Sequence, residues 1–146
     1  MRELAEDLMT TVAGLRRVVR RRVWETMPGA PLRPAQLELL RVVETQPGIG
    51  VAAAARVLHL AGNSVSTMVN HLVDAGLLER RVDPEDRRAV RLDLTDAAHA
   101  RLDHWRRTRT EYVAGAIATL PGGDREAIAA AVPALGRLIT SLREER

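Results

Sequence analysis

The spacing of apolar residues changes along this chain from a helical period to a strand period and back to a helical one. In the middle of the chain it predicts a short helix over 51–58, a turn over 60–63 and a second helix that closes at 74–76. Two strands, 78–82 and 89–94, follow with alternating apolar and polar positions. The second helix carries one apolar stripe, formed by Val65, Met68, Val69, Leu72 and Val73.

The opposite face of this second helix is polar but carries neither Lys nor Arg. It consists of Asn63, Ser64, Ser66, Thr67, Asn70 and His71. Two short helices followed by a hairpin predict a winged helix-turn-helix, whose second helix enters the major groove of double-stranded DNA. Asn can pair with adenine, whereas Ser and Thr serve a base or a phosphate. Two alternatives stay open. Ser64 is also suited to cap the helix, and His71 is equally suited to be an exposed residue that reads no base.

Longer amphipathic helices are expected on both sides of this central stretch. They cover 3–27, 34–45, 95–119 and 125–143, with Thr95 and Asp124 as caps of the last two and Pro133 inside the last. The first helix needs a partner for its apolar stripe, and a second subunit is the natural candidate. We therefore expect a mainly α fold with a small β-hairpin wing (α+β), in which 1–146 form one domain. Within it, 34–95 form the winged part, and 1–30 and 96–146 form a helical dimerisation base.

Composition excludes several classes of protein. The chain has no Cys, which excludes disulfides and thiol-based sensing, and it has no apolar run of about 18 residues that would span a membrane. It has no phosphate loop, dinucleotide fingerprint, H-E-x-x-H or G-x-S-x-G motif, so we expect neither an enzyme nor a cofactor. The start of the chain does not resemble a secretory signal, and a cytoplasmic location is expected.

One polar set could hold a metal ion. Asp96, His99 and Asp103 are spaced by three and seven residues on one helix face. Because only one of them is a histidine, the interpretation as an ordinary polar helix face is preferred, and no metal site is predicted.

The hairpin carries the most specific motif in the chain. The run Gly76-Leu-Leu-Glu-Arg-Arg81, then Asp83-Pro-Glu-Asp-Arg-Arg88, then Leu92-Asp-Leu-Thr95 resembles the wing signature of the MarR family of bacterial transcription regulators. The resemblance extends over essentially the whole chain. It implies a homodimer that binds a pseudo-palindromic operator as a repressor and is often released by a small effector.

The resemblance also assigns the wing tip. Arg88 matches the arginine that enters the minor groove, Asp86 matches the acid that orients it, and Arg87 is placed to touch phosphate. The alternative interpretation is a solvated tip with a weak ion pair. The sequence departs from the family in one respect, because relatives usually carry Arg or Lys on the second helix and residues 61–73 have none. This shifts the electrostatic share of DNA binding to the wing and to other arginines.

The first helix has a basic cluster, Arg16, Arg17, Arg20, Arg21 and Arg22, although the net charge is only +3. A solvated face is the preferred interpretation, and contact with phosphate or with an anionic effector is the alternative. By analogy with the family, an anionic aromatic effector would be lined by Arg16, Arg20 and Trp24. A constitutive or architectural DNA-binding protein without an effector remains the second functional hypothesis.

Overall fold

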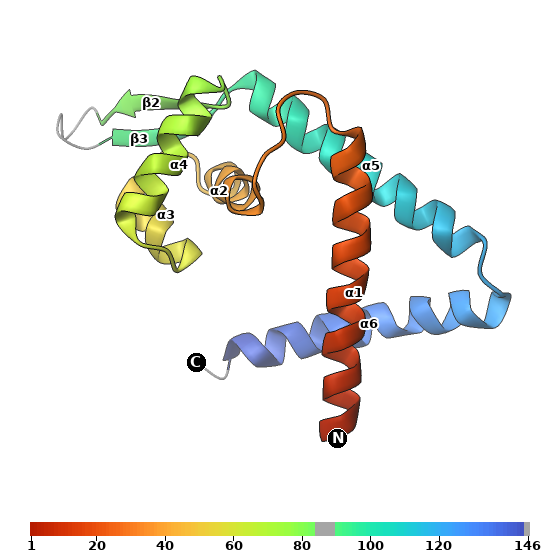
Figure 1. The fold of residues 1–146 in the computed structure, drawn as a ribbon. Helices are drawn as coiled ribbons and strands as arrows, with labels where there is room; N and C mark the ends of the chain where they lie inside the picture. Colours follow the sequence, from red (N-terminus) through yellow and green to blue (C-terminus); the bar gives the residue numbers. More distant parts are fainter. Residues whose placement is uncertain (84–89, 145–146) are drawn as a thin grey trace. The chain divides into compact units, whose positions relative to one another are not determined.

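The structure is a computed structural model that describes residues 1–83 and 90–144 (Figure 1). The chain divides into two compact units, residues 21–107 and residues 1–20 with 108–146, here called the winged unit and the helical unit. Both boundaries fall inside long helices, α1 (Arg2–Thr26) and α5 (Asp96–Ala118). The function of each part as a winged or a dimerisation region stays a prediction.

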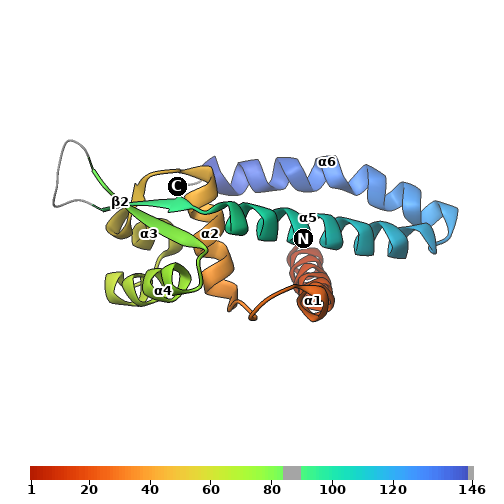
Figure 2. The same cartoon turned by 90° about the horizontal axis from the view of Figure 1, so that it is seen from above.

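The winged unit contains the predicted helix-turn-helix. Helix α2 (Pro34–Thr45) and helix α3 (Val51–Leu58) have the predicted bounds, and α4 (Gly62–Asp74) begins inside the predicted turn. The turn itself is made by His59, which adopts the left-handed conformation with φ of 54° and ends α3. Figure 2 shows these three helices gathered beside the wing strands.

The wing is a small antiparallel sheet in the strand order β1-β3-β2. Strands β2 (Leu78–Val82) and β3 (Val90–Leu94) confirm the predicted hairpin, and Ala89 lies outside the described residues. Their register pairs Leu78 with Leu94 and Arg80 with Leu92. The third strand, β1 (Ile49–Gly50), was not predicted, because two residues are too few to show an alternating pattern.

Gly76 lies at the junction of α4 with the wing, and Thr95 lies at the junction of the wing with α5. Gly76 has a φ of +69° and ends α4 as the predicted left-handed residue. Thr95 Oγ1 accepts a hydrogen bond from the Ala98 N–H at 3.2 Å, which confirms Thr95 as the cap of α5. The same hydroxyl donates to the Gly76 carbonyl at 2.7 Å, so one side chain holds both junctions together.

A continuous apolar core lies within the winged unit. It receives Leu37, Leu39, Leu40 and Val43 from α2. Fully buried side chains of other elements complete it, among them Val65, Val69 and Leu72 of α4, Leu92 of β3 and Leu102 of α5. The apolar stripe of α4 is thus packed on α3 and β2, which fixes the rotation of the helix about its axis.

The helical unit contains the first part of α1, the last part of α5 and α6 (Gly122–Glu144). The prediction that Asp124 caps α6 is wrong, because the helix begins two residues earlier and Asp124 lies in its first turn. Pro133 lies inside α6 as expected. None of the described residues of α6 is buried within the single chain, although the helix carries an apolar stripe.

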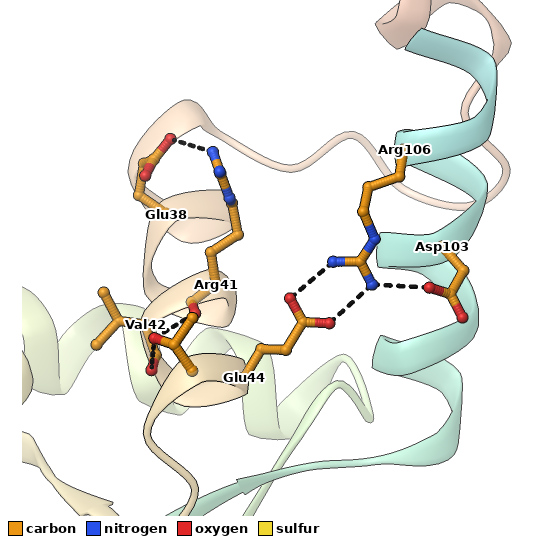
Figure 3. Close-up of polar contacts among 7 residues, drawn as sticks. Glu38, Arg41, Val42, Glu44, Asp103 and Arg106 are labelled. Atoms are coloured by element: carbon orange, nitrogen blue, oxygen red, sulfur yellow. Dashed lines mark hydrogen bonds and ion pairs between the residues drawn. The ribbon is translucent and has the colours of Figure 1, made fainter. Parts of the chain in front are cut away.

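A bidentate ion pair links α2 to the first turns of α5 inside the winged unit (Figure 3). Arg106 donates from Nη1 and Nη2 to the two carboxylate oxygens of Glu44, each at 2.8 Å, and Nη2 also donates to Asp103 at 2.7 Å. These hydrogen bonds lower the pKa of Glu44 and of Asp103 and raise that of Arg106. The Glu44 side chain is mostly shielded from solvent, so this pair is less screened than a surface ion pair.

We expect a Glu44→Gln variant to lose on the order of 1 kcal/mol of unfolding free energy at pH 7, because the Arg106 guanidinium loses its charged partner. The folded-state pKa of Glu44 lies below its unfolded value, so its contribution is complete above the unfolded pKa. The contribution disappears as the pH falls through the folded pKa. Urea unfolding at pH 7 and in acid checks this.

The matched control is Glu38→Gln, because Glu38 meets Arg41 at a longer 3.4 Å and both side chains are about half exposed. This control should change the unfolding free energy less at pH 7. A loss in Glu44→Gln that stays the same in acid would contradict the assignment of its effect to charge.

Candidate nucleic-acid interface

The polar face of α4 is solvent-exposed along its whole length. All six residues predicted for DNA contact are exposed: Asn63, Ser64, Ser66, Thr67, Asn70 and His71. The positions 63, 66, 67, 70 and 71 repeat at helical spacing and so lie on one face, with position 64 at its margin. This face is opposite the apolar stripe that the core buries, which makes it available to a partner.

The first turn of α4 is held by its own polar groups. The Asn63 Oδ1 accepts the Ser64 backbone N–H at 2.8 Å, and the Thr67 hydroxyl donates to the Asn63 carbonyl at 3.0 Å. The N-cap residue is Ala61, which makes no side-chain cap. The alternative of Ser64 as a helix cap is therefore wrong, and its hydroxyl is free of that structural role.

The structure adds one residue that the sequence prediction omitted. Arg80 of β2 donates from Nη2 to the Oδ1 of Asn70 on α4, which places a guanidinium beside the polar helix face. Strands and helix are neighbours in both views of the fold (Figures 1 and 2). The signal that could have found Arg80 is its strand position, two residues after the buried Leu78.

The other arginines of the wing strands meet carboxylates. Arg81 Nε lies 3.0 Å from Asp93 and 3.4 Å from Glu79, and Arg91 lies 2.8 Å from Asp83. The predicted wing-tip residues Asp86, Arg87 and Arg88 lie outside the described residues. Their assignment to the minor groove stays a prediction.

The predicted effector residues lie on α1 at intervals of four, which places them on one side of that helix. Arg16 and Arg20 are exposed, whereas Trp24 is half-buried and its Nε1 has no hydrogen-bond partner. Arg21 and Arg22 instead meet Glu25 at 3.4 Å and 3.2 Å. Hence part of the basic cluster is paired along its own helix, as expected for a solvated face.

Other kinds of site find little support. Across residues 1–83 and 90–144, no three His, Asp or Glu side chains converge on a point that could hold a metal ion. Asp103, one of the three residues weighed for such a site, is bound to Arg106 instead. Within the described part of the chain, no helix has the length and apolar character to cross a membrane.

Comparison with known proteins points to one family. The model of the MarR family matches residues 30–89, which include the helix-turn-helix. An HTH-type transcriptional regulator of Mycobacterium tuberculosis is 26% identical over 136 residues, 93% of this chain and 92% of its own length. YpoP, an HTH-type transcriptional regulator of Bacillus subtilis, is 27% identical over 77 residues, 53% of this chain and 55% of its own.

Solved structures share the fold. A MarR family protein from Bacillus stearothermophilus superposes with a TM-score of 0.74 at 18% identity, over 94% of each chain. A mutant of S. aureus MepR bound to an oligodeoxyribonucleotide has a TM-score of 0.70 at 18% identity, over 95% of this chain and 97% of its own. The wing motif, the fold and these matches make the chain similar to the MarR family of DNA-binding, winged helix-turn-helix transcriptional regulators.

Proposed function

We propose that this regulator is a homodimeric repressor that binds a pseudo-palindromic operator. Each subunit inserts α4 into a major groove and the wing, with Arg88 at its tip, into the adjacent minor groove. The observation that supports this best is the exposed polar face of α4, held outward by its buried apolar stripe. A similar protein, S. aureus MepR, has a solved structure with an oligodeoxyribonucleotide, which favours the same partner here.

The dimer is supported by apolar surface that a single chain leaves in water. On α6, Leu138, Ile139 and Leu142 are 42%, 53% and 61% exposed, and on α1 Leu4 and Leu15 are 62% and 57% exposed. Contiguous apolar positions on long helices are stabilised when a second copy covers them. Two bound subunits would place their α4 helices about one DNA turn apart, roughly 34 Å, so the operator would have two related half-sites.

Release by a small anionic aromatic compound is the second element of the proposal. The half-buried Trp24 offers an aromatic ring, and the exposed Arg16 and Arg20 on the same helix offer positive charge. A constitutive or architectural DNA-binding protein is the alternative. It differs in one measurable respect, because no ligand would change its affinity for DNA.

The dimer proposal predicts that the double variant Leu138→Glu/Leu142→Glu sediments as a monomer at micromolar concentration, because it places carboxylates in an apolar interface. Because the variant no longer dimerises, its operator affinity should fall as well. Its far-UV circular dichroism should still show the helices of the wild type. The control is Thr140→Glu, because Thr140 is exposed and lies on the face of α6 opposite the apolar stripe. A double variant that stays dimeric would place the interface elsewhere.

The wing proposal predicts that Arg88→Ala weakens operator binding by about 1–3 kcal/mol, the range of a specific arginine contact. Dimerisation and thermal stability should be unchanged, because the proposed partner of Arg88 is DNA and not another part of the protein. Arg125→Ala on α6 removes the same charge in the helical unit and serves as control. Electrophoretic mobility shifts on an operator selected from random DNA measure the effect, and equal binding by both variants would refute it.

The effector proposal predicts that one or more members of a panel of benzoate derivatives lower operator affinity about fivefold or more, a typical allosteric coupling. The same compound should quench the fluorescence of Trp24, tested in a Trp105→Phe background that leaves Trp24 as the only tryptophan. Arg20→Ala should weaken the ligand response without weakening DNA binding. Operator binding that no compound of the panel alters would favour the constitutive alternative.

A further inference from the structure

Helix α4 lacks the positive charge that DNA binding requires. Residues 62–74 contain neither Arg nor Lys, and His71 is the only basic residue of the helix. Affinity for duplex DNA comes largely from cations that neutralise phosphates, and guanine is read mainly by arginine. Some other element must therefore supply a cation next to this helix, if the chain binds DNA as proposed above.

The register of the wing places Arg80 on the side of the sheet that faces the core. Side chains alternate along a strand, so Arg80 shares a face with Leu78, which is buried. Arg80 also pairs across the ladder with Leu92, which is fully buried. Glu79 and Arg81 occupy the other face of β2. The side chain of Arg80 thus extends past the edge of the core toward α4, where it reaches Asn70.

Arg80 differs from its neighbours in charge balance. Arg81 lies beside Asp93 and Glu79, and Arg91 lies beside Asp83, so both are neutralised within the wing. Within the part of the chain that the structure describes, Arg80 meets no carboxylate, and its polar contact is the neutral amide of Asn70. Its positive charge is held in position without being cancelled.

The contact also sets what Asn70 can recognise. A guanidinium has only donors, so the atom of Asn70 that faces it is the amide oxygen. Arg80 has further N–H donors besides the Nη2 group that the Asn70 oxygen accepts. Bidentate pairing of Asn70 with adenine needs that oxygen as an acceptor for the adenine amino group, which the contact with Arg80 opposes.

We propose that Arg80, positioned by Asn70, is the cation of the recognition surface and donates hydrogen bonds to an acceptor on DNA. The acceptors that fit are the O6 and N7 atoms of guanine in the major groove or the oxygens of a backbone phosphate. This inference rests on the proposed DNA-binding function and adds a DNA-contacting residue outside α4 and outside the wing tip. It also assigns Asn70 a positioning role.

The experiment compares Arg80→Ala with Arg81→Ala, which removes the same charge from the same strand on the opposite face. Operator affinity is measured on a sequence selected from random DNA. Arg80→Ala should weaken binding about 5- to 150-fold, the range for one bidentate arginine contact. Arg81→Ala should change it by no more than about twofold, since exposed ion pairs contribute little. Thermal unfolding of both variants checks that the fold is kept.

Asn70→Ala tests the positioning role. It should weaken binding less than Arg80→Ala, and the double variant should bind as weakly as Arg80→Ala alone, because Asn70 acts through Arg80. Additive losses would show that Asn70 contacts DNA independently. Arg80→Lys keeps the charge but loses the two-pronged donor geometry.

Two further measurements distinguish the acceptors. For a phosphate, Arg80→Lys restores most of the affinity, and Arg80→Ala lowers the salt slope of binding by about one ion. For a guanine, Arg80→Lys stays weak, and 7-deazaguanine at one operator position weakens the wild type but not Arg80→Ala. Equal binding by Arg80→Ala and Arg81→Ala overturns this inference alone. A wild-type protein that binds no duplex at low ionic strength overturns the proposed function as well.

Discussion

The orientation of α4 depends on one packing constraint, the burial of its apolar stripe against α3 and strand β2 of the wing. Val65, Val69 and Leu72 are fully buried, and they meet a core that also contains Leu92 and Leu102. Protein interiors are close-packed, so a rotation of α4 would open cavities on one side and overlap atoms on the other. The polar face is therefore presented outward as a direct consequence of burying the opposite one. Every proposed contact of this helix with DNA depends on that packing.

A second constraint, the two-residue period of the strands, distributes charge over the wing. On β2 it places Arg80 on the face of the buried Leu78, while Glu79 and Arg81 lie on the other. The ion pairs of Arg81 and Arg91 connect the two wing strands and stabilise the hairpin at the expense of net charge. The arginines that form ion pairs within the wing and Arg80, the proposed DNA contact, thus lie on opposite sides of the sheet.

The two compact units differ in how complete they are as single-chain structures. The winged unit contains a closed apolar core, and the Glu44–Arg106 pair joins α2 to α5 within it. The described residues of α6 in the helical unit are all at least partly exposed, including its apolar stripe. This contrast is expected if the winged unit is stable within one subunit and the helical unit requires a second copy.

Periodicity and turn chemistry in the sequence were sufficient to place the helices and the hairpin. Apolar spacing located α2 and α3, and Gly76 and Thr95 marked ends where glycine and threonine have strong local preferences. The start of α6 was misplaced, because Asp124 suits a first-turn position as well as a cap. The exposed polar face of α4 was also predictable, since it is the complement of the apolar stripe.

Only the tertiary structure showed the two-residue strand β1, the pairing of Glu44 with Arg106 sixty-two positions away and the approach of Arg80 to Asn70. Those features arise from the sheet register and from packing between distant segments, and local sequence patterns carry no information on which side chains such packing brings together.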